Sequence, residues 1–178
     1  MNSYAVRVGL TDTLNELDLH SNDLFGTGQA GACTSRALTF EALLARPVPT
    51  QPRGIVRNNI MYAGQCSTNF DITETSAAAD PRIVENNVLW FATASVTALY
   101  RDENATNITA IASVNALGDI SAANNLSVDP LVNATFHIPM ASPARNAGTA
   151  TGAPNTDFEN DMRPLEGAFD IGADEYRP

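Results

Sequence analysis

Asp157, Glu159 and Asp161 place a carboxylate at every second position near the C-terminus. Carboxylates at this spacing can bind calcium, which takes oxygen ligands. The other interpretation is a solvent-exposed acidic turn in which Arg163 pairs with Asp161 or Asp170. We favour the acidic turn, so we expect no cofactor, and calcium is the one candidate metal.

Arg57 and Glu85 hold matching positions in two similar segments, 56–62 and 84–90. Both are expected to face outward near a bend of the chain, which makes them the candidate catalytic residues. They can equally form a surface ion pair, which contributes little to stability, and we favour this interpretation.

Other catalytic groupings have less support. His20 and His137 lie far apart, and no Ser or Cys nucleophile pattern accompanies either, so a catalytic triad is not supported. Asp71, Asp102 and Asp119 would meet only if loops brought them together. The sequence does not give the carboxylate separation that glycoside hydrolysis requires.

Three aromatic residues, Tyr62, Trp90 and Tyr100, are candidates for ligand binding. Aromatic rings have an apolar face that can stack on sugars when it is exposed. Their neighbours in sequence are apolar, however, so packing in the core is the favoured interpretation.

The elements that would position these residues are marked by a repeated pair of asparagines. The segment VRNNIMY at 56–62 returns as VENNVLW at 84–90 and AANNL at 122–126, and a weaker copy, LHSNDLF, occupies 19–25. Each copy predicts a strand, a sharp bend and a second strand, because Asn tolerates the left-handed conformation of a bend. In stacked coils the equivalent side chains form a hydrogen-bonded ladder, which we assign to Asn22, Asn58, Asn86 and Asn124.

The 28 to 38 residues between these asparagines predict a parallel β-solenoid with loop insertions. The alternative is a β-sandwich with Asn-rich turns. Period-two alternation predicts strands at 4–10, 14–19 and 108–114, whereas the Gly-rich stretch 26–35 is predicted to be a loop. Residues 36–46 fit a strand or a short helix capped by Ser35, and we favour the strand.

Cys33 and Cys66 each follow one of the Asn segments. Equivalent positions on neighbouring coils would be about 4.8 Å apart, which is within reach of a disulfide. We predict a bridge between them, and two free thiols are the alternative. Two cysteines without matched His spacing do not indicate zinc.

Composition limits the partners. The 178 residues suit one domain, and twenty acidic against ten basic residues give a net charge of −10. This balance argues against nucleic acid and against an anionic membrane surface. No apolar run is long enough to span a membrane, and the N-terminus lacks the regions of a signal peptide.

The C-terminal block carries four short motifs in order: VDPLV at 128–132, SPARNAG at 142–148, DMRP at 161–164 and DIGADEY at 170–176. This order resembles the C-terminal end of bacterial secreted proteins of the pectate-lyase-like superfamily. The resemblance implies an all-β fold, a right-handed parallel β-helix forming a short solenoid of a few coils. It implies coils in residues 1–135 and a C-terminal cap at 136–178 packed on the last coil. The chain is shorter than typical members, as though only the last coils were present.

The resemblance also frames the function. Lyases of the superfamily abstract a proton with Arg or Lys beside calcium, and its hydrolases use clustered Asp residues. Our first hypothesis is a non-catalytic extracellular or cell-surface domain that binds polysaccharide or a surface, or forms a structural part of a larger secreted protein. One alternative is a lyase or glycoside hydrolase acting on acidic polysaccharide. Another is an interaction protein that forms homodimers through its N-terminal coil edge.

Overall fold

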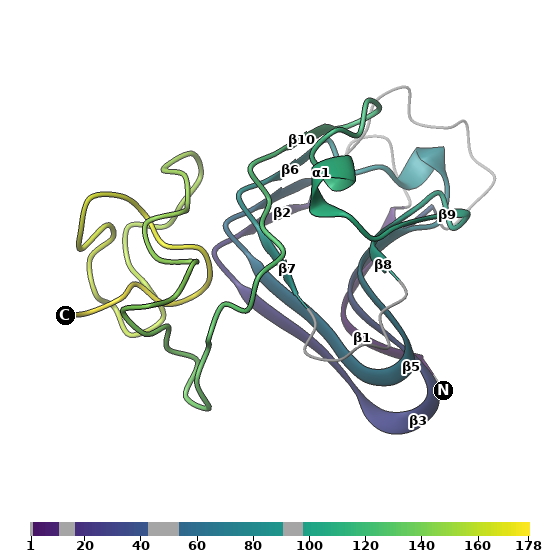
Figure 1. Ribbon diagram of the computed structural model, residues 1–178. Coiled ribbons are helices and arrows are strands. Elements are labelled where there is room, and N and C mark those ends of the chain that lie inside the picture. The colour runs from purple at the N-terminus through teal and green to yellow at the C-terminus, as the bar shows by residue number, and fades with distance from the viewer. Residues whose placement is uncertain (1, 11–16, 43–53, 91–97) are drawn as a thin grey trace.

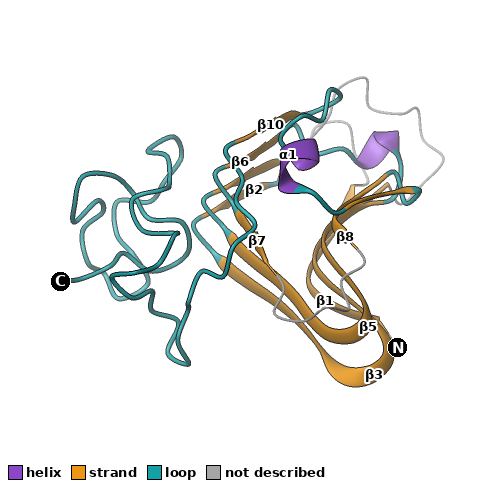
Figure 2. Ribbon diagram, in the orientation of Figure 1, coloured by secondary structure: helices purple, strands orange, loops and turns teal. Residues whose placement is uncertain are grey.

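The computed structural model describes residues 2–10, 17–42, 54–90 and 98–178 (Figure 1). Almost all of its regular secondary structure is β-strand, with little helix (Figure 2). In chain order the elements are β1 (Asn2–Leu10), β2 (Asp18–His20), β3 (Asp23–Ala42), β4 (Ile55–Arg57), β5 (Ile60–Glu74), the 3₁₀ helix η1 (Ala77–Ala79), β6 (Ile83–Glu85), β7 (Val88–Trp90), β8 (Ala98–Asp102), β9 (Thr106–Ile108), α1 (Ile111–Val114) and β10 (Ser121–Ala123).

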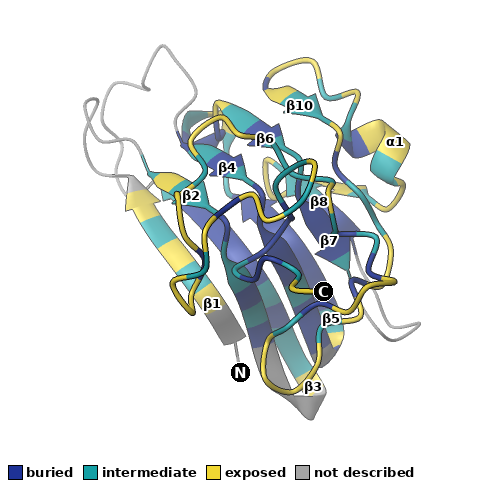
Figure 3. Cartoon of the chain, turned by 90° about the vertical axis from the view of Figure 1, so that its left-hand side faces the viewer, coloured by how far each residue is buried: buried dark blue, intermediate teal, exposed yellow. Residues whose placement is uncertain are grey.

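The strands form two sheets. One has the order β1-β3-β5-β8-β9, with β7 also paired to β5, and the other has the order β10-β6-β4-β2. All pairs are parallel except the antiparallel β8–β9 hairpin. Each strand therefore lies beside the equivalent strand of the next sequence repeat (Figure 3).

A two-residue bend joins the second sheet to the first in every repeat. The first residue of each bend has a left-handed backbone: Ser21 (φ 54°), Asn58 (φ 54°), Asn86 (φ 52°) and Asn124 (φ 55°). Asn adopts this conformation more readily than most residues with a Cβ. We call the four bends together the bend row.

The asparagine ladder runs through the second residue of each bend. The side-chain amide of Asn22 donates to Asn59 Oδ1 at 3.1 Å, Asn59 donates to Asn87 at 3.1 Å, and Asn87 donates to Asn125 at 2.9 Å. Asn115, which follows α1, accepts from Asn125 at 2.8 Å and ends the ladder.

The assignment of Asn58, Asn86 and Asn124 to the ladder was therefore wrong by one position. A left-handed residue turns its side chain out of the stack, and Asn58 and Asn86 bond instead to carbonyls of the C-terminal segment. The residue after the turn points inward, where its amide meets the equivalent amide of the next repeat.

The main core lies between the two sheets, where apolar side chains from neighbouring repeats stack in register. Leu24 pairs with Met61, which pairs with Leu89, and all three are buried. On the second sheet Val56 pairs with Val84, and both are fully buried. Because the strands pair in parallel and in register, apolar residues of successive repeats lie next to one another and form continuous apolar rows.

The long strand β3 covers the stretch 26–35 that was predicted to be a loop, with register shifts against β5 between Thr27 and Thr34. Cross-strand pairing therefore overrides the Gly-rich composition, and the strand absorbs its extra residues as bulges. In this region Cys33 and Cys66 form a disulfide with a Cα–Cα distance of 5.0 Å. Of the stretch 36–46, residues up to Ala42 are strand, and the rest lies outside the described residues, as do 14–16.

The C-terminal residues 127–178, called here the C-terminal segment, contain no strand or helix and lie along the bend row (Figures 1 and 3). Asn58 and Thr149 exchange two hydrogen bonds, at 2.7 and 2.9 Å. A second apolar core forms beneath the segment from Ile60, Val88, Ile138, Ala144 and Ile171. No described helix is long and apolar enough to cross a membrane.

The position of this segment corrects the expected cap on the last coil. The segment packs across the side of several repeats, because the outward side chains of Ile60 and Val88 are apolar and need cover. The helix α1 lies at the end of the strand stack instead (Figure 3). It also replaces the strand predicted at 108–114, since β9 ends at Ile108 and Val114 turns into the main core.

Candidate functional site

A row of aromatic side chains crosses the outer face of the first sheet. Phe25 pairs in register with Tyr62, and Tyr62 pairs with Trp90. Each follows an inward-facing core residue by one position, so it points outward, and all three are half-buried. The Phe25 and Tyr62 ring centroids are 6.0 Å apart. We call these three residues the aromatic row.

Gly64 sets the orientation of the central ring. It lies two residues after Tyr62, on the same face of β5, and any side chain there would collide with the Tyr62 ring. The ring therefore lies along the strand over Gly64.

A pocket of about 290 Å³ opens beside the aromatic row. One wall comes from the first repeat and the other from the C-terminal segment, and the lining residues are Asn22, Asp23, Leu24, Phe136, Phe158 and Ala173. Phe136 is 52% exposed, and its ring centroid is 5.8 Å from that of Phe25. The pocket and the aromatic row therefore form one continuous surface.

Phe136 is held in place at an energetic cost. Its φ is 65°, and the left-handed conformation costs a non-glycine residue about 1–2 kcal/mol. Strained conformations of bulky residues occur more often at ligand sites than elsewhere.

Asp23 provides the charge in the pocket. Its Oδ1 accepts a hydrogen bond from the Ala173 N–H at 3.1 Å, whereas Oδ2 is buried and has no hydrogen-bond partner in the part of the chain that the structure describes. The pKa of Asp23 is raised to about 6, mainly by burial and less by the nearby Asp174, while the Ala173 N–H and Arg163 oppose the shift. At neutral pH the carboxyl is mostly ionised.

An acidic group with one histidine lies in the C-terminal segment. The donor atoms of His137, Glu159 and Asp174 lie within 4.8 Å of one another, and so do those of Asp157, Glu159 and Asp161. The residues of the calcium hypothesis are therefore close enough to hold an ion together.

Much of this group is already hydrogen-bonded within the chain. Asp157 accepts from the backbone N–H groups of Glu159 and Asp161, both at 2.9 Å. His137 Nε2 lies 2.9 Å from Glu159, and this contact raises the pKa of the histidine. Arg177 pairs with Asp161 at 3.1 Å.

Arg163 does not take the partner expected from the sequence. Its side chain is fully buried and binds Glu175 at 2.8 Å, together with the backbone carbonyls of Asp170 and Gly172. It thus fastens the last residues of the segment to one another.

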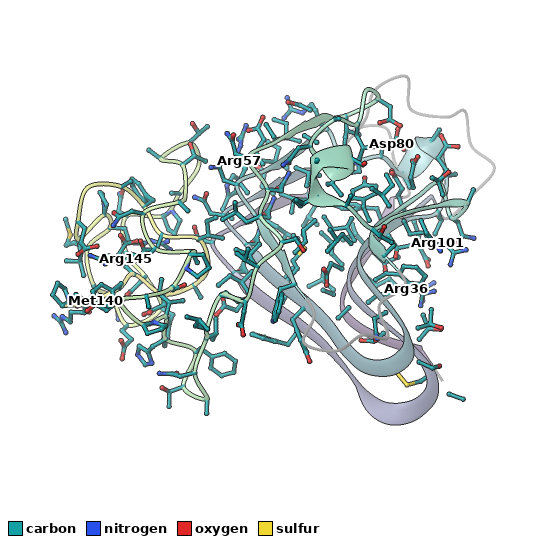
Figure 4. The ribbon with its side chains drawn as sticks, viewed as in Figure 1. Arg36, Arg57, Asp80, Arg101, Met140 and Arg145 are labelled. Atoms are coloured by element: carbon teal, nitrogen blue, oxygen red, sulfur yellow. A yellow bond between two sulfur atoms is a disulfide. The ribbon has the colours of Figure 1, made fainter. Side chains whose placement is uncertain are left out.

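Arg57 and Glu85 form an ion pair at 3.1 Å across the neighbouring strands β4 and β6. Ser121 on β10 also donates to Glu85 at 3.1 Å. Figure 4 places Arg57 on the outer side of the second sheet. The two candidate catalytic residues therefore bind each other, as the ion-pair interpretation expects.

Tyr100, the third aromatic candidate, is fully buried and cannot stack on a ligand. It pairs with Ile72 on β5, so it belongs to the inner row of the sheet. The prediction that it could contact a sugar is wrong because its position in the strand faces the core.

Tyr100 lies beside a group of acids, Glu74, Asp80 and Asp102, none of which lines the pocket. Burial raises the pKa of Glu74 to about 10, and the Asp80 carboxyl beside it adds to the shift. Glu74 is 1% exposed, and one oxygen of each carboxyl has no hydrogen-bond partner within the described ranges. Asp102 and Asp119 lie near enough to raise the pKa of Asp80, and Figure 4 shows Asp80 beside η1.

Asp71 is separate from this group and fully buried. It accepts from the Ala63 N–H at 2.9 Å, and burial raises its pKa well above the usual range. His20 lies beside Gly152, and its pKa is lowered by burial. His137 instead lies 2.9 Å from the Thr135 hydroxyl and 2.9 Å from Glu159, so an exposed hydroxyl, imidazole and carboxylate stand in line, without a Ser or Cys and without any of these Asp residues.

The sequence interpretation missed Phe25, Asp23, Phe136 and Phe158. One signal for Phe25 was present: aligned on the second bend residue, Phe25, Tyr62 and Trp90 all stand three positions later. The same alignment places Asp23 where other repeats have an apolar residue. Nothing in the sequence indicated that Phe136 and Phe158 would meet the first repeat.

Comparison with protein-family models, curated proteins and solved structures found no significant match.

Proposed function

We propose that this chain is a short right-handed parallel β-helix, similar to those of the pectate-lyase-like superfamily, and that it binds glycans without catalysing a reaction. The fold is supported by two sheets of parallel strands that pair in register from repeat to repeat. The bends between them and the asparagine ladder repeat in the same way.

Glycan binding rests on one observation, the aromatic row. Phe25, Tyr62 and Trp90 stand on adjacent parallel strands, which are spaced about 4.8 Å apart. Aromatic rings that are partly open to solvent provide an apolar face together with a polar edge, which suits the mixed surface of a sugar. A row of such rings favours an extended chain over a single small molecule.

A non-catalytic role is supported by the state of the candidate catalytic pair. The Arg57 guanidinium and the Glu85 carboxylate bind each other, so Glu85 cannot accept a proton without losing the pair, and a guanidinium has no site that accepts one. The disulfide between Cys33 and Cys66 fits an oxidising compartment and supports the proposed extracellular or cell-surface location.

The sole tryptophan of the chain, Trp90, allows a direct binding assay. Titration with neutral, amino and acidic oligosaccharides should change the Trp90 emission for at least one class. Tyr62→Ala should weaken that binding about tenfold or more. Met140→Ala, an exposed apolar residue of the C-terminal segment, is the control and should bind as the wild type does.

The same panel tests the enzyme alternative. Unsaturated products or new reducing ends that disappear in Arg57→Ala would replace our proposal with a lyase or hydrolase. A folded protein whose emission responds to no glycan would remove the glycan-binding proposal.

A further inference from the structure

The pocket beside the aromatic row has a charge that the described residues do not balance. Asp23 stands in register with Ile60, which pairs with Val88, and both of those side chains are buried apolar residues. A carboxylate therefore takes the place of an apolar side chain beneath the C-terminal segment. Burying a charge is costly unless a counter-ion or hydrogen bonds compensate it.

The groups around Asp23 do not supply that compensation. Ala173 provides one backbone N–H to Oδ1, and Oδ2 has no hydrogen-bond partner among the described residues. Asp174 adds a second negative charge. Arg163, whose positive charge lowers the pKa of Asp23, already binds Glu175 at 2.8 Å.

The walls of the pocket indicate which cation would fit. Phe136 and Phe158 are half-exposed, and the ring centroids of Phe25 and Phe136 are 5.8 Å apart. The faces of aromatic rings attract organic cations. A metal ion would need several oxygen ligands. Asp23 is not part of either group of described residues that could share a metal ion, so an organic cation fits the pocket better than a metal.

We propose that this pocket binds the primary ammonium group of an amino sugar, with Asp23 as its counter-ion, while the rest of the glycan lies along the aromatic row. The inference rests on the proposed function, because the row must bind the glycan chain. The pocket volume of about 290 Å³ lies near the lower end of the range for small-molecule sites and suits one sugar unit. The net charge of −10 also favours a cationic ligand over an acidic one.

The test compares three oligomers of equal length, made of glucosamine, N-acetylglucosamine and glucose, by Trp90 emission and calorimetry. The wild type should bind the glucosamine oligomer about tenfold or more tightly than the other two. Asp23→Asn should lose this preference and still bind the glucose oligomer. Glu103→Gln removes one charge from an exposed position and should leave the preference unchanged.

The outcomes separate the two proposals. Equal affinity of the wild type for all three oligomers would overturn the ammonium site and leave the glycan-binding row intact, whereas no binding of any oligomer would overturn both. A folded Asp23→Asn protein that keeps the full preference would also overturn the site. Should that variant not fold, the wild type is tested with a glucosamine oligomer that carries one methyl group on each nitrogen. This group keeps the positive charge and two N–H donors, so its affinity must remain above that of the N-acetylated oligomer, and equal affinities would overturn the site.

Discussion

Replacing Glu74 with glutamine should make the protein more stable than the wild type, by a margin that grows as the pH rises. Glu74 is 1% exposed, and its pKa is raised from 4.5 to about 10, first by burial and then by Asp80. The native state therefore holds a proton that the unfolded chain releases above about pH 4.5. Stability contributed by this group falls as the pH rises from there towards about 10.

The magnitude follows from the linkage between proton binding and folding. One proton of difference changes the free energy of unfolding by about 1.4 kcal/mol per pH unit. Between pH 5 and pH 8 the wild type should therefore lose up to about 4 kcal/mol through Glu74 alone. Glutamine keeps the shape and can donate to Asp80, but it carries no titrating proton.

Urea unfolding of both proteins at pH 5, 6.5 and 8 measures this difference. The free energy of unfolding of Glu74→Gln, relative to wild type, should increase by several kcal/mol over the range. Glu103→Gln makes the same substitution at an exposed position near Asp80 and should show almost no trend. A Glu74→Gln protein that is destabilised equally at all three pH values would refute the reasoning, because the native carboxyl would then be ionised.

The remaining predictions concern the ladder, the disulfide and self-association. Asn87→Ala should lower the free energy of unfolding in urea by at least about 3 kcal/mol, because it leaves buried partners such as the Val56 carbonyl unsatisfied. Asn86→Gly should lower it by less than about 1 kcal/mol, since glycine accepts the left-handed bend. Equal losses in the two variants would contradict the ladder. Replacing Cys33 and Cys66 together with serine should cost about 3–4 kcal/mol for a 33-residue separation, and a change below about 1 kcal/mol would show that the bridge does not constrain the unfolded chain. Light scattering at micromolar concentration should detect a dimer if the edge strands β1 and β2 pair with a second copy, and a strictly monomeric protein would count against that proposal.

The repeated asparagine pairs gave the architecture its most reliable sequence signal, since a bend depends mainly on local backbone preference. They predicted where the chain turns, and the structure has a left-handed residue at Asn58, Asn86 and Asn124. Which of the two amides joins the ladder was predicted wrongly for Asn58, Asn86 and Asn124, because the inward direction depends on the register of the stacked strands. A shift of one residue moves a side chain to the opposite face.

Strand register also decided which of the three aromatic candidates face outward. Tyr62, Trp90 and Tyr100 have similar apolar neighbours in sequence, yet the first two face outward and Tyr100 faces the core. Strand pairing decided this.

The sequence by itself determined an all-β chain with repeated bends, an acidic surface and aromatic residues near those bends, because composition and local conformational preference act within a few residues. Only the tertiary structure decided that Asp23 and Phe136 share a pocket. They are 113 positions apart, and they meet because the C-terminal segment covers the outward apolar side chains of Ile60 and Val88. That packing depends on the combined surface of several repeats, which exists only after the strands have paired.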